Sequence, residues 1–565
     1  MKLWNNFKKM TALVLALMMC LSFVACGNSK APEDDTSTDK TMIEPETTNT
    51  PENTTPISKF ATPGQQKYPE TVTVTSIKEL DPSTITFAEG EDIENNIWTR
   101  AALEEYGIQI KYKWVAPSAQ YAEKIALMLS TGDMPDFFPL DAVGFKQAMK
   151  SNMLADLTEA YETTASEATK ERMNLDGGDA LKAGTVDNKL YAIVQANSWK
   201  TDSIQQLWIR NDWLKKLNLS VPKTVDQLIE VATAFAKNDP DGNNKDDTLG
   251  LGMQSFLDYN GLLCGMNAYR DIWYPDSSGK LVYGSVQPEM KAALLKVQEM
   301  YSNGLLDKEF YLKTYDNYKQ DITTGKIGMM FDNYITPLHC MDNWDADKNA
   351  DWQSYPLPAL TEADYPAKST VMNGFTYYLV VNKNCKNPEA LIKLINLFVD
   401  KQSNDGDYIT DKDGRAVWNY APANISTPDN NLINQRLIAE ALKKNSPDGL
   451  PTQAVQNYNN VINLQNGSTD KTDWALAKIF GDPSSLSVLD QNYILPKHYI
   501  QDYWYGAPTP TMVKSWASLT DLQKQAFTNI VLGASIDEFD AFVKNWYKMG
   551  GEQIVAEVNE EYAAR

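Results

Sequence analysis

The stretch from Leu207 to Gly252 constrains the fold of this chain most, because it holds three recognisable units in a fixed order. It begins as an apolar strand, continues as an amphipathic helix and ends in an acidic loop. Thr224 and Gln227 have the spacing of a capping box, in which each side chain hydrogen-bonds to the backbone of the other residue at the start of a helix. Apolar residues then recur at the spacing of one helical face, which predicts that this face is buried. They are Val225, Leu228, Ile229, Ala232 and Phe235.

The acidic loop after this helix carries oxygen atoms at alternate positions. Four side chains and the backbone carbonyl of Lys245 would supply them, from Asp239, Asp241, Asn243, Lys245 and Asp247. Ca²⁺ takes roughly six to eight oxygen ligands in a flexible geometry, so the spacing predicts a structural calcium site. The loop departs from an EF-hand, because its glycine stands at the fourth position (Gly242) and its twelfth residue is Gly250. A solvated Asp/Asn/Gly turn is the alternative.

Fragments spread over nearly the whole chain point to a known family. Besides RNDWL, VPKT and the acidic loop they are STGDMPDFF (Ser130–Phe138), DNKLYAI (Asp187–Ile193), GKLVYGSVQPEMKAAL (Gly279–Leu294), GKIGMMFDN (Gly325–Asn333), GAPTPTM (Gly506–Met512) and GGEQIVAEVNEEYA (Gly550–Ala563). In this order they resemble the extracellular solute-binding lipoproteins of the maltose-binding-like class, in particular the large branch that includes the alginate-binding proteins. The resemblance implies a component of a carbohydrate ABC transporter. It also implies calcium in the acidic loop, although that branch has a Glu where this chain has Thr248.

The resemblance implies an α/β fold of the periplasmic-binding-protein-like type II, with two α/β lobes and a three-crossing hinge. The residues themselves favour α/β architecture, because a strand from Val72, a helix over 95–106 and a strand over 108–114 form a parallel unit. A folded part of about 500 residues is also too long for a single core.

The family pattern places the three crossings near RNDWL, after GMMFDN and after the strand within 373–382. The N-terminal lobe is therefore expected over 69–206 plus about 338–384. The C-terminal lobe is expected over 207–337 plus about 385–565.

The N-terminus has the pattern of an export signal. Residues 1–25 contain three lysines and then an apolar run that is too short to span a membrane. The junction FVAC-G resembles a lipobox, which implies acylation of Cys26 and anchoring to the outer side of the cell membrane. An ordinary signal peptide that leaves a free secreted protein is the alternative. Residues 26–68 are predicted to form a disordered tether, because they contain few residues that could be buried.

The acidic balance of the chain excludes some functions. Its formal net charge is −22, and no basic stripe interrupts it, so nucleic acid is not an expected partner. The sequence has no GxSxG, HExxH, P-loop or GxGxxG motif, and His339 and His498 are its only histidines, so we expect no enzyme. A secreted glycan-active enzyme with two carboxylates in its cleft is the alternative. We expect buried thiols rather than a disulfide framework from the cysteines after Cys26, which are Cys264, Cys340 and Cys385.

Sugar binding needs flat aromatic faces and fixed polar groups, and this chain has aromatic residues in Gly-, Pro- and Asp-rich segments. The predicted substrate contacts are Trp273, Tyr334, Trp504, Trp199, Trp344 and Asn333. Each aromatic ring could instead seal the surface of its lobe. We expect a monomer that captures a neutral or weakly charged oligosaccharide and presents it to an ABC permease. A peptide or lipid receptor of the same fold is a further alternative.

Overall fold

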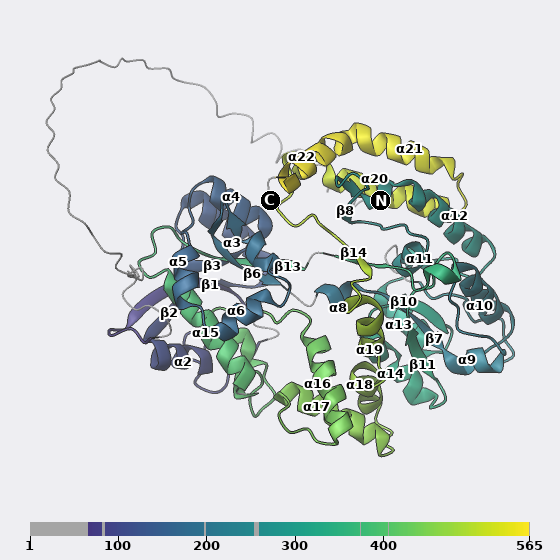
Figure 1. Cartoon of the computed structure of the whole chain (residues 1–565), viewed down its shortest axis with the longest axis horizontal. Coiled ribbons are helices and arrows are strands. Elements are labelled where there is room, and N and C mark those ends of the chain that lie inside the picture. The colour runs from purple at the N-terminus through teal and green to yellow at the C-terminus, as the bar shows by residue number, and fades with distance from the viewer. Residues whose placement is uncertain are drawn as a thin grey trace, which may run out of the picture. The chain divides into compact units, whose positions relative to one another are not determined.

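The computed structural model describes residues 66–81, 85–196, 199–253, 259–372, 374–404 and 406–563 (Figure 1). The predicted signal peptide, the predicted lipid-attachment residue Cys26 and the tether up to residue 65 lie outside this part of the chain. Within the described part, no helix is both long enough and apolar enough to cross a membrane.

The first unit of the fold is the predicted strand, helix and strand. Strands β1 (Val72–Glu79) and β2 (Ile108–Ala116) pair in parallel, with Val72 opposite Ile108. Helix α2 (Ile97–Tyr106) connects them. Asn96 caps this helix by accepting from the backbone N–H of Trp98 at 3.0 Å, and Gly107 ends it with a φ of 70°. The predicted parallel unit is therefore confirmed.

A first hydrophobic core forms beside this pair around an antiparallel sheet in the order β3-β13-β6. The strands are β3 (Phe137–Leu140), β13 (Phe375–Val381) and β6 (Ala192–Ala196). The helices that contribute buried residues include α3 (Ser118–Thr131), α4 (Ala142–Lys150), α5 (Thr158–Thr164), α6 (Glu167–Asn174), α7 (Asp179–Ala183) and α15 (Glu389–Asn404). Trp98 on α2 stacks on Phe398 of α15 with ring centroids 5.3 Å apart, so residues far apart in sequence close this core.

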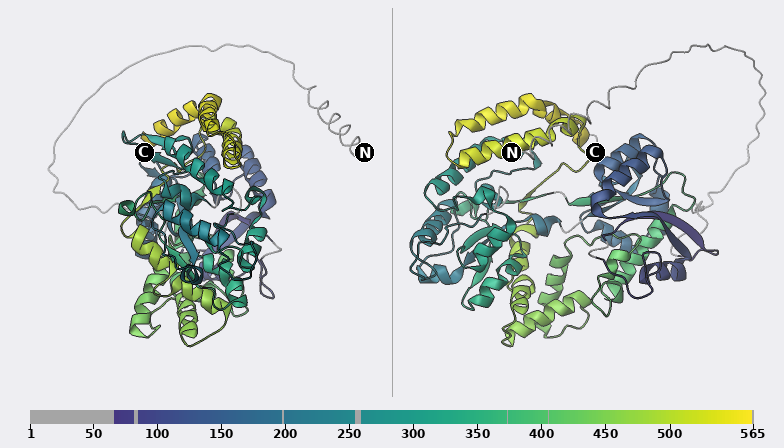
Figure 2. Two further views of the ribbon diagram at one scale, coloured as in Figure 1. Left: turned by 90° about the vertical axis from the view of Figure 1, so that its right-hand side faces the viewer. Right: turned by 180° about the vertical axis from the view of Figure 1, so that it is seen from behind.

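A second core is organised by an antiparallel sheet in the order β10-β7-β11. The strands are β10 (Met329–Asp332), β7 (Gln206–Arg210) and β11 (Trp352–Tyr355). The helices on or beside this core include α9 (Asn211–Lys216), α10 (Val225–Lys237), α11 (Asn260–Gly265), α12 (Pro288–Ser302), α13 (Tyr315–Thr323), α14 (Thr336–Ala346), α16 (Asn430–Lys444), α17 (Thr452–Gln465), α18 (Lys471–Phe480), α19 (Ser485–Leu489), α20 (Pro510–Val531), α21 (Asp537–Trp546) and α22 (Glu552–Ala563). Figures 1 and 2 show α20 lying along α12, and these two helices are in contact.

Two short strand pairs complete the second core. Strands β8 (Trp273–Pro275) and β9 (Leu281–Tyr283) form a hairpin. Strand β12 (Ser369–Val371) pairs in parallel with β14 (Tyr499–Gln501). These pairs carry the loops that matter for the candidate site below.

Helix α10 agrees closely with its prediction. The Thr224 hydroxyl accepts from the backbone N–H of Gln227 at 3.2 Å, and the Gln227 side chain accepts from the N–H of Thr224 at 3.3 Å. Val225, Leu228, Ala232 and Phe235 are buried as expected, whereas Ile229 is half-buried. The capping box and the apolar face are thus confirmed.

The buried residues of the two cores come from separate ranges of the chain, while the lobe limits stay a prediction. The first core takes its buried residues from 68–194 and 378–425, and the second takes them from 204–371 and 432–558. The chain therefore passes between the cores at 195–203, 372–377 and 426–431. Helix α15 packs into the first core, whereas Trp344 on α14 lies in a smaller cluster of buried residues with Trp208, Trp352 and Trp474.

Candidate functional site

A polar cluster joins two of the crossing segments to the turn after β10. Tyr334 in that turn is 3% exposed, and its hydroxyl accepts from Asn431 Nδ2 at 2.6 Å. The same hydroxyl hydrogen-bonds to Asp202, which lies on the short helix α8 (Trp199–Ser203). Burial raises the pKa of Asp202 to about 6, against the effect of the bond from Tyr334. One phenol thus connects a carboxylate and an amide from segments more than two hundred residues apart.

A second pair of contacts reinforces the link between these crossing segments. The Asp429 carboxylate accepts from the backbone N–H of Thr201 at 3.1 Å and from its hydroxyl at 3.2 Å. Gln195 Nε2 donates to Ser426 Oγ at 2.8 Å. Burial raises the pKa of Asp429. The segments 195–203 and 426–431 are therefore tied together by at least three hydrogen bonds.

An aromatic loop follows β14 and is organised by one buried carboxylate. Asp502 Oδ1 accepts from the backbone N–H groups of Trp273 and Trp504, each at 3.0 Å. Burial raises the pKa of Asp502 to about 7. The ring of Tyr505 meets that of Phe375 on β13 edge-on, with centroids 5.5 Å apart. The loop thereby brings aromatic rings up to the crossing segment at 372–377.

The predicted substrate contacts differ in how much surface they expose. Trp504 is half-buried, while Tyr503 beside it is 36% exposed. Trp273 is 2% exposed, with its ring 5.2 Å from that of Tyr283. Trp344 lies on a helix rather than in a loop and stacks on Trp474 at 5.3 Å.

Two further predicted contacts border the polar cluster. Asn333 precedes Tyr334, and its side chain accepts from the backbone N–H of Ile335 at 3.0 Å. The backbone carbonyl of Asn333 accepts from Trp208 Nε1 at 3.0 Å, so the turn is held on both sides. Trp199 begins α8, and its side chain lies outside the described part of the structure.

Sequence reasoning missed Asp202, Asp429 and Asn431. Their segments, WKTDS and TPDNN, are rich in polar residues, which is also the composition of an ordinary solvated turn. Only tertiary contacts distinguish them, with Tyr334 for Asp202 and Asn431 and with Thr201 for Asp429.

Hydrogen bonds among its own side chains hold the acidic loop together. Asn243 Nδ2 donates to Asp241 Oδ2 at 2.7 Å and to Asp247 Oδ1 at 3.0 Å, so one amide draws both carboxylates together. Asp239 turns its carboxylate inward, where it accepts from the backbone N–H of Gly242 at 3.1 Å. Partial burial raises the pKa of Asp241, and its contact with the Asp239 carboxyl raises that pKa further.

This donor set fits Ca²⁺ in chemistry, because it consists of carboxylate, amide and carbonyl oxygens. The backbone N–H of Lys245 donates to Asn243 Oδ1 at 2.7 Å, which keeps the loop tightly turned. Thr248 contributes nothing, because its hydroxyl donates to the carbonyl of Phe235 at 2.7 Å. As the side chains stand, no three Asp, Glu, His or Cys groups of the described chain already form a metal-binding cluster.

Two hollows lie among elements of the second core. One of about 380 Å³ borders the acidic loop and is lined by Arg210, Asp212, Lys216 and Asp241 among others. Another, of about 510 Å³, lies between β11 and helices α17 to α19. Neither has Tyr334, Asn431 or Trp504 in its lining.

The remaining reactive side chains are engaged or buried. His339 Nδ1 lies 3.2 Å from Asp332 Oδ2, and His498 Nε2 lies 2.7 Å from the carbonyl of Pro366. The three cysteines after Cys26 are free thiols, and burial raises the pKa of Cys264 to about 11. The described chain therefore offers no disulfide and no low-pKa thiol among these residues.

Comparison with known proteins gives consistent matches. The profile of the family described as bacterial extracellular solute-binding protein matches residues 88–405. Lipoprotein LipO of Bacillus subtilis (strain 168) is 25% identical over 487 residues, which cover 82% of this chain and 88% of LipO. The fructooligosaccharide ABC transporter substrate-binding protein FusA of Streptococcus pneumoniae serotype 4 (strain ATCC BAA-334 / TIGR4) is 27% identical over 248 residues, which are 40% of this chain and 44% of FusA.

Solved structures show the same fold. An HMO binding ABC-transporter associated solute-binding protein from Bifidobacterium longum infantis ATCC 15697 has a TM-score of 0.61 at 17% identity, over 88% of this chain and 99% of that chain. FusA of S. pneumoniae in complex with kestose has a TM-score of 0.55 at 16% identity, over 87% of this chain and 99% of that chain. Another FusA structure is of an EF-hand mutant with fructo-nystose. The α/β fold of the periplasmic-binding-protein-like type II is therefore shown.

Proposed function

Because this chain belongs to the bacterial extracellular solute-binding proteins, we propose that it captures an oligosaccharide outside the cell and delivers it to an ABC permease. The observation that carries the proposal is the family match over residues 88–405, together with a relative, FusA, whose structure contains kestose. The family is one of binding proteins, which supports capture of the ligand without cleavage.

The proposed site lies at the crossings between the two cores. Trp504 and its neighbours Tyr503 and Tyr505 supply aromatic faces for pyranose or furanose rings. Asp202 and Asn431 supply a carboxylate and an amide for sugar hydroxyls. Both side chains hydrogen-bond to the Tyr334 hydroxyl, which holds them in position without a ligand.

The other predicted contacts take supporting roles in this proposal. Asn333 holds the turn that presents Tyr334, and Trp199 starts the helix that carries Asp202. Trp273 holds the aromatic loop through its backbone N–H on Asp502, while its buried ring fills the core. Trp344 is proposed to act only through packing, because Trp474 covers its ring.

The proposed mechanism is closure of one core over the other around the ligand. A ligand that contacts both cores binds the closed arrangement better than the open one, so it shifts the population toward closure. The permease then recognises the closed form. Closure would bend the three crossing segments, and two of them are already tied together through Thr201 and Asp429.

Two further features belong to the proposal. Acylation of Cys26 would hold the monomer at the membrane, and the similarity to a protein named lipoprotein LipO supports this. The acidic loop would hold one structural Ca²⁺ through Asp239, Asp241, Asn243, the carbonyl of Lys245 and Asp247. An EF-hand in the relative FusA supports this assignment.

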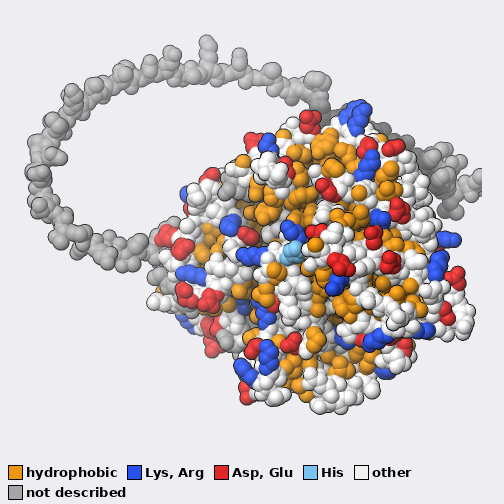
Figure 3. Space-filling model, turned by 45° about the vertical axis from the view of Figure 1, so that its right-hand side comes forward, with side chains coloured by type: hydrophobic (Ala, Val, Ile, Leu, Met, Phe, Trp, Pro, Cys, Tyr) orange, Lys and Arg blue, Asp and Glu red, His pale blue; other side chains and the backbone are white. Residues whose placement is uncertain are grey.

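A thermal-shift screen against neutral and acidic glycans tests the function, followed by calorimetry with the best ligand. We expect a neutral or weakly charged oligosaccharide to raise the melting temperature and to be recovered intact. On the face drawn in Figure 3, basic side chains are scattered among acidic ones, which fits a ligand of low charge. A peptide or lipid as the best ligand would overturn the sugar assignment, and cleavage of the glycan would favour an enzyme.

A further inference from the structure

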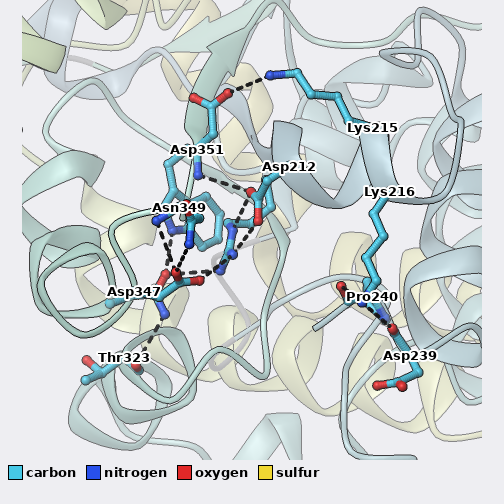
Figure 4. A network of polar contacts seen from close by, with 12 residues as sticks. Asp212, Lys215, Lys216, Asp239, Pro240, Thr323, Asp347, Asn349 and Asp351 are labelled. Atoms are coloured by element: carbon cyan, nitrogen blue, oxygen red, sulfur yellow. Dashed lines mark hydrogen bonds and ion pairs between the residues drawn. The ribbon is translucent and has the colours of Figure 1, made fainter. Parts of the chain in front are cut away.

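A lysine of the protein contacts the acidic loop from outside. Lys216 at the end of α9 donates from Nζ to the backbone carbonyls of Pro240 at 2.9 Å and Asp239 at 3.2 Å (Figure 4). These carbonyls belong to the first two residues of the proposed calcium loop. A positive charge of the chain thus lies beside the loop, on two carbonyls that are not among its proposed calcium ligands.

The helix that carries Lys216 is held firmly in place. Arg210 forms a two-pronged ion pair with Asp212 at the start of α9, and Asp212 accepts from the backbone N–H of Asp351 at 3.1 Å. Asn211 donates its backbone N–H to the carbonyl of Asp351 at 2.8 Å. Figure 4 shows Asp212 and Asp351 together on one side and Lys216 with Pro240 and Asp239 on the other. The ammonium group is therefore positioned by the sheet and not only by its own flexible side chain.

The loop backbone is fitted closely around this ammonium group. Gly242 has a φ of +78°, and a Cβ atom built on it would lie 2.7 Å from Lys216 Nζ. Any larger residue there would be strained in its backbone and would also displace the lysine. The positive φ is therefore the main reason for glycine here, since the flexible end of Lys216 can shift at little cost.

We propose that Lys216 is a resident counter-cation of the acidic loop, which holds the loop folded without metal and opposes the binding of Ca²⁺. Both cations draw on the same oxygen-rich segment, and like charges at close range repel each other. A group that stabilises the metal-free loop more than the metal-bound loop must weaken metal binding by the same factor. The predicted effect on calcium affinity rests on the proposed calcium site. The predicted stabilisation of the metal-free loop by Lys216 does not depend on that site.

The test compares Lys216→Met with Lys215→Met in the full mature chain after removal of metals. Lys215 is the matched control, because it has the same charge on the same helix but its Nζ lies 3.3 Å from Asp351 and not against the loop. Hydrogen exchange of the amides at Gly242 and Asn244 reports on the loop, and calorimetric titration with CaCl₂ reports on affinity. We expect Lys216→Met to speed this exchange and to tighten calcium binding roughly three- to tenfold at low ionic strength, with a smaller gain at high salt. Lys215→Met should do neither.

Equal behaviour of the two variants in both measurements would overturn the role of Lys216. If the wild type binds no calcium at millimolar concentration, the calcium site itself fails. In that case, faster exchange in Lys216→Met alone still supports the counter-cation, and unchanged exchange overturns it.

Discussion

Replacement of Asp502 by Asn tests whether one buried carboxylate organises the aromatic loop at a cost in stability. Asp502 accepts two hydrogen bonds, from the backbone N–H groups of Trp273 and Trp504. Both bonds end on the same atom, Oδ1. The amide oxygen of Asn can accept both of these bonds. The substitution therefore removes the buried charge while it keeps the acceptor.

The direction of the effect follows from the pKa of this carboxyl. Burial raises the pKa of Asp502 from 3.8 to about 7, so the folded protein binds this proton more tightly than the unfolded chain does. Stability contributed by Asp502 is consequently highest below pH 4 and falls as the pH rises through 4 to 7. A pKa change of this size corresponds to a few kcal/mol, on the order of 4 kcal/mol at most. Since Asn has no charge to desolvate, Asp502→Asn should be more stable than the wild type at pH 8 and similar to it at pH 4.5.

The assay is the melting temperature of both proteins between pH 4.5 and 8, measured by scanning calorimetry and tryptophan fluorescence. Because the entropy of unfolding grows with chain length, about 1 kcal/mol shifts the midpoint of a folded unit of about 500 residues by roughly 1 °C, so a gain of a few degrees at pH 8 is expected. Asp276→Asn in the neighbouring hairpin is the control. The side-chain bond from Ser278 holds the pKa of Asp276 below its usual value, so this variant should lose stability above pH 4. A difference between Asp502→Asn and wild type that does not change with pH would refute the reasoning.

Four further outcomes are expected. Trp504→Ala should weaken oligosaccharide binding roughly tenfold or more in calorimetry. Trp344→Ala should instead lower the free energy of unfolding by about 3–5 kcal/mol through lost packing. If Trp344→Ala weakened binding and Trp504→Ala only destabilised the fold, the two roles would be exchanged. Tyr334→Phe should lower the melting temperature, because Asp202 and Asn431 lose their hydrogen-bond partner, which costs about 1–3 kcal/mol of folding stability. An unchanged melting temperature would contradict the proposed polar cluster. Chelation with EDTA should lower the free energy of unfolding by about 2.7 kcal/mol if calcium was present at a hundredfold excess over its Kd. An unchanged melting temperature, together with no calcium by elemental analysis, would rule out the site. Cys26→Ser should move the protein from the membrane to the soluble fraction, and unchanged fractionation would disprove the anchor.

Local patterns predicted the local structure well. The capping box and apolar face of α10 and the parallel pair of β1 and β2 depend on residues within one or two helical turns or on neighbouring elements, so short-range spacing is sufficient. In the loop 239–247 the Asn243 amide bonds to two carboxylates, while the predicted calcium site stays a prediction.

Burial of single aromatic residues was not predictable, because it depends on distant partners. Trp344 was expected in a loop, yet its ring stacks on Trp474, which lies 130 residues further along the chain. Tyr334 is buried for the same kind of reason, since Asn431 reaches it from the crossing segment 426–431. The substrate contacts remain predictions, and the structure favours Trp504 among them because its ring stays partly exposed.

The strand order β3-β13-β6 bears on how the chain folds as it emerges from synthesis. The central strand of that sheet, β13, is encoded about 180 residues after β6, and the helix α15 that closes the same core follows later still. Residues 66–196 alone would leave two edge strands with no strand between them, exposing unpaired backbone and apolar side chains. The amino-terminal half therefore cannot mature before residue 425 is available, and folding should be slow and dominated by long-range contacts. A chain that stops short of β13 should aggregate or be degraded rather than persist as a stable half-protein.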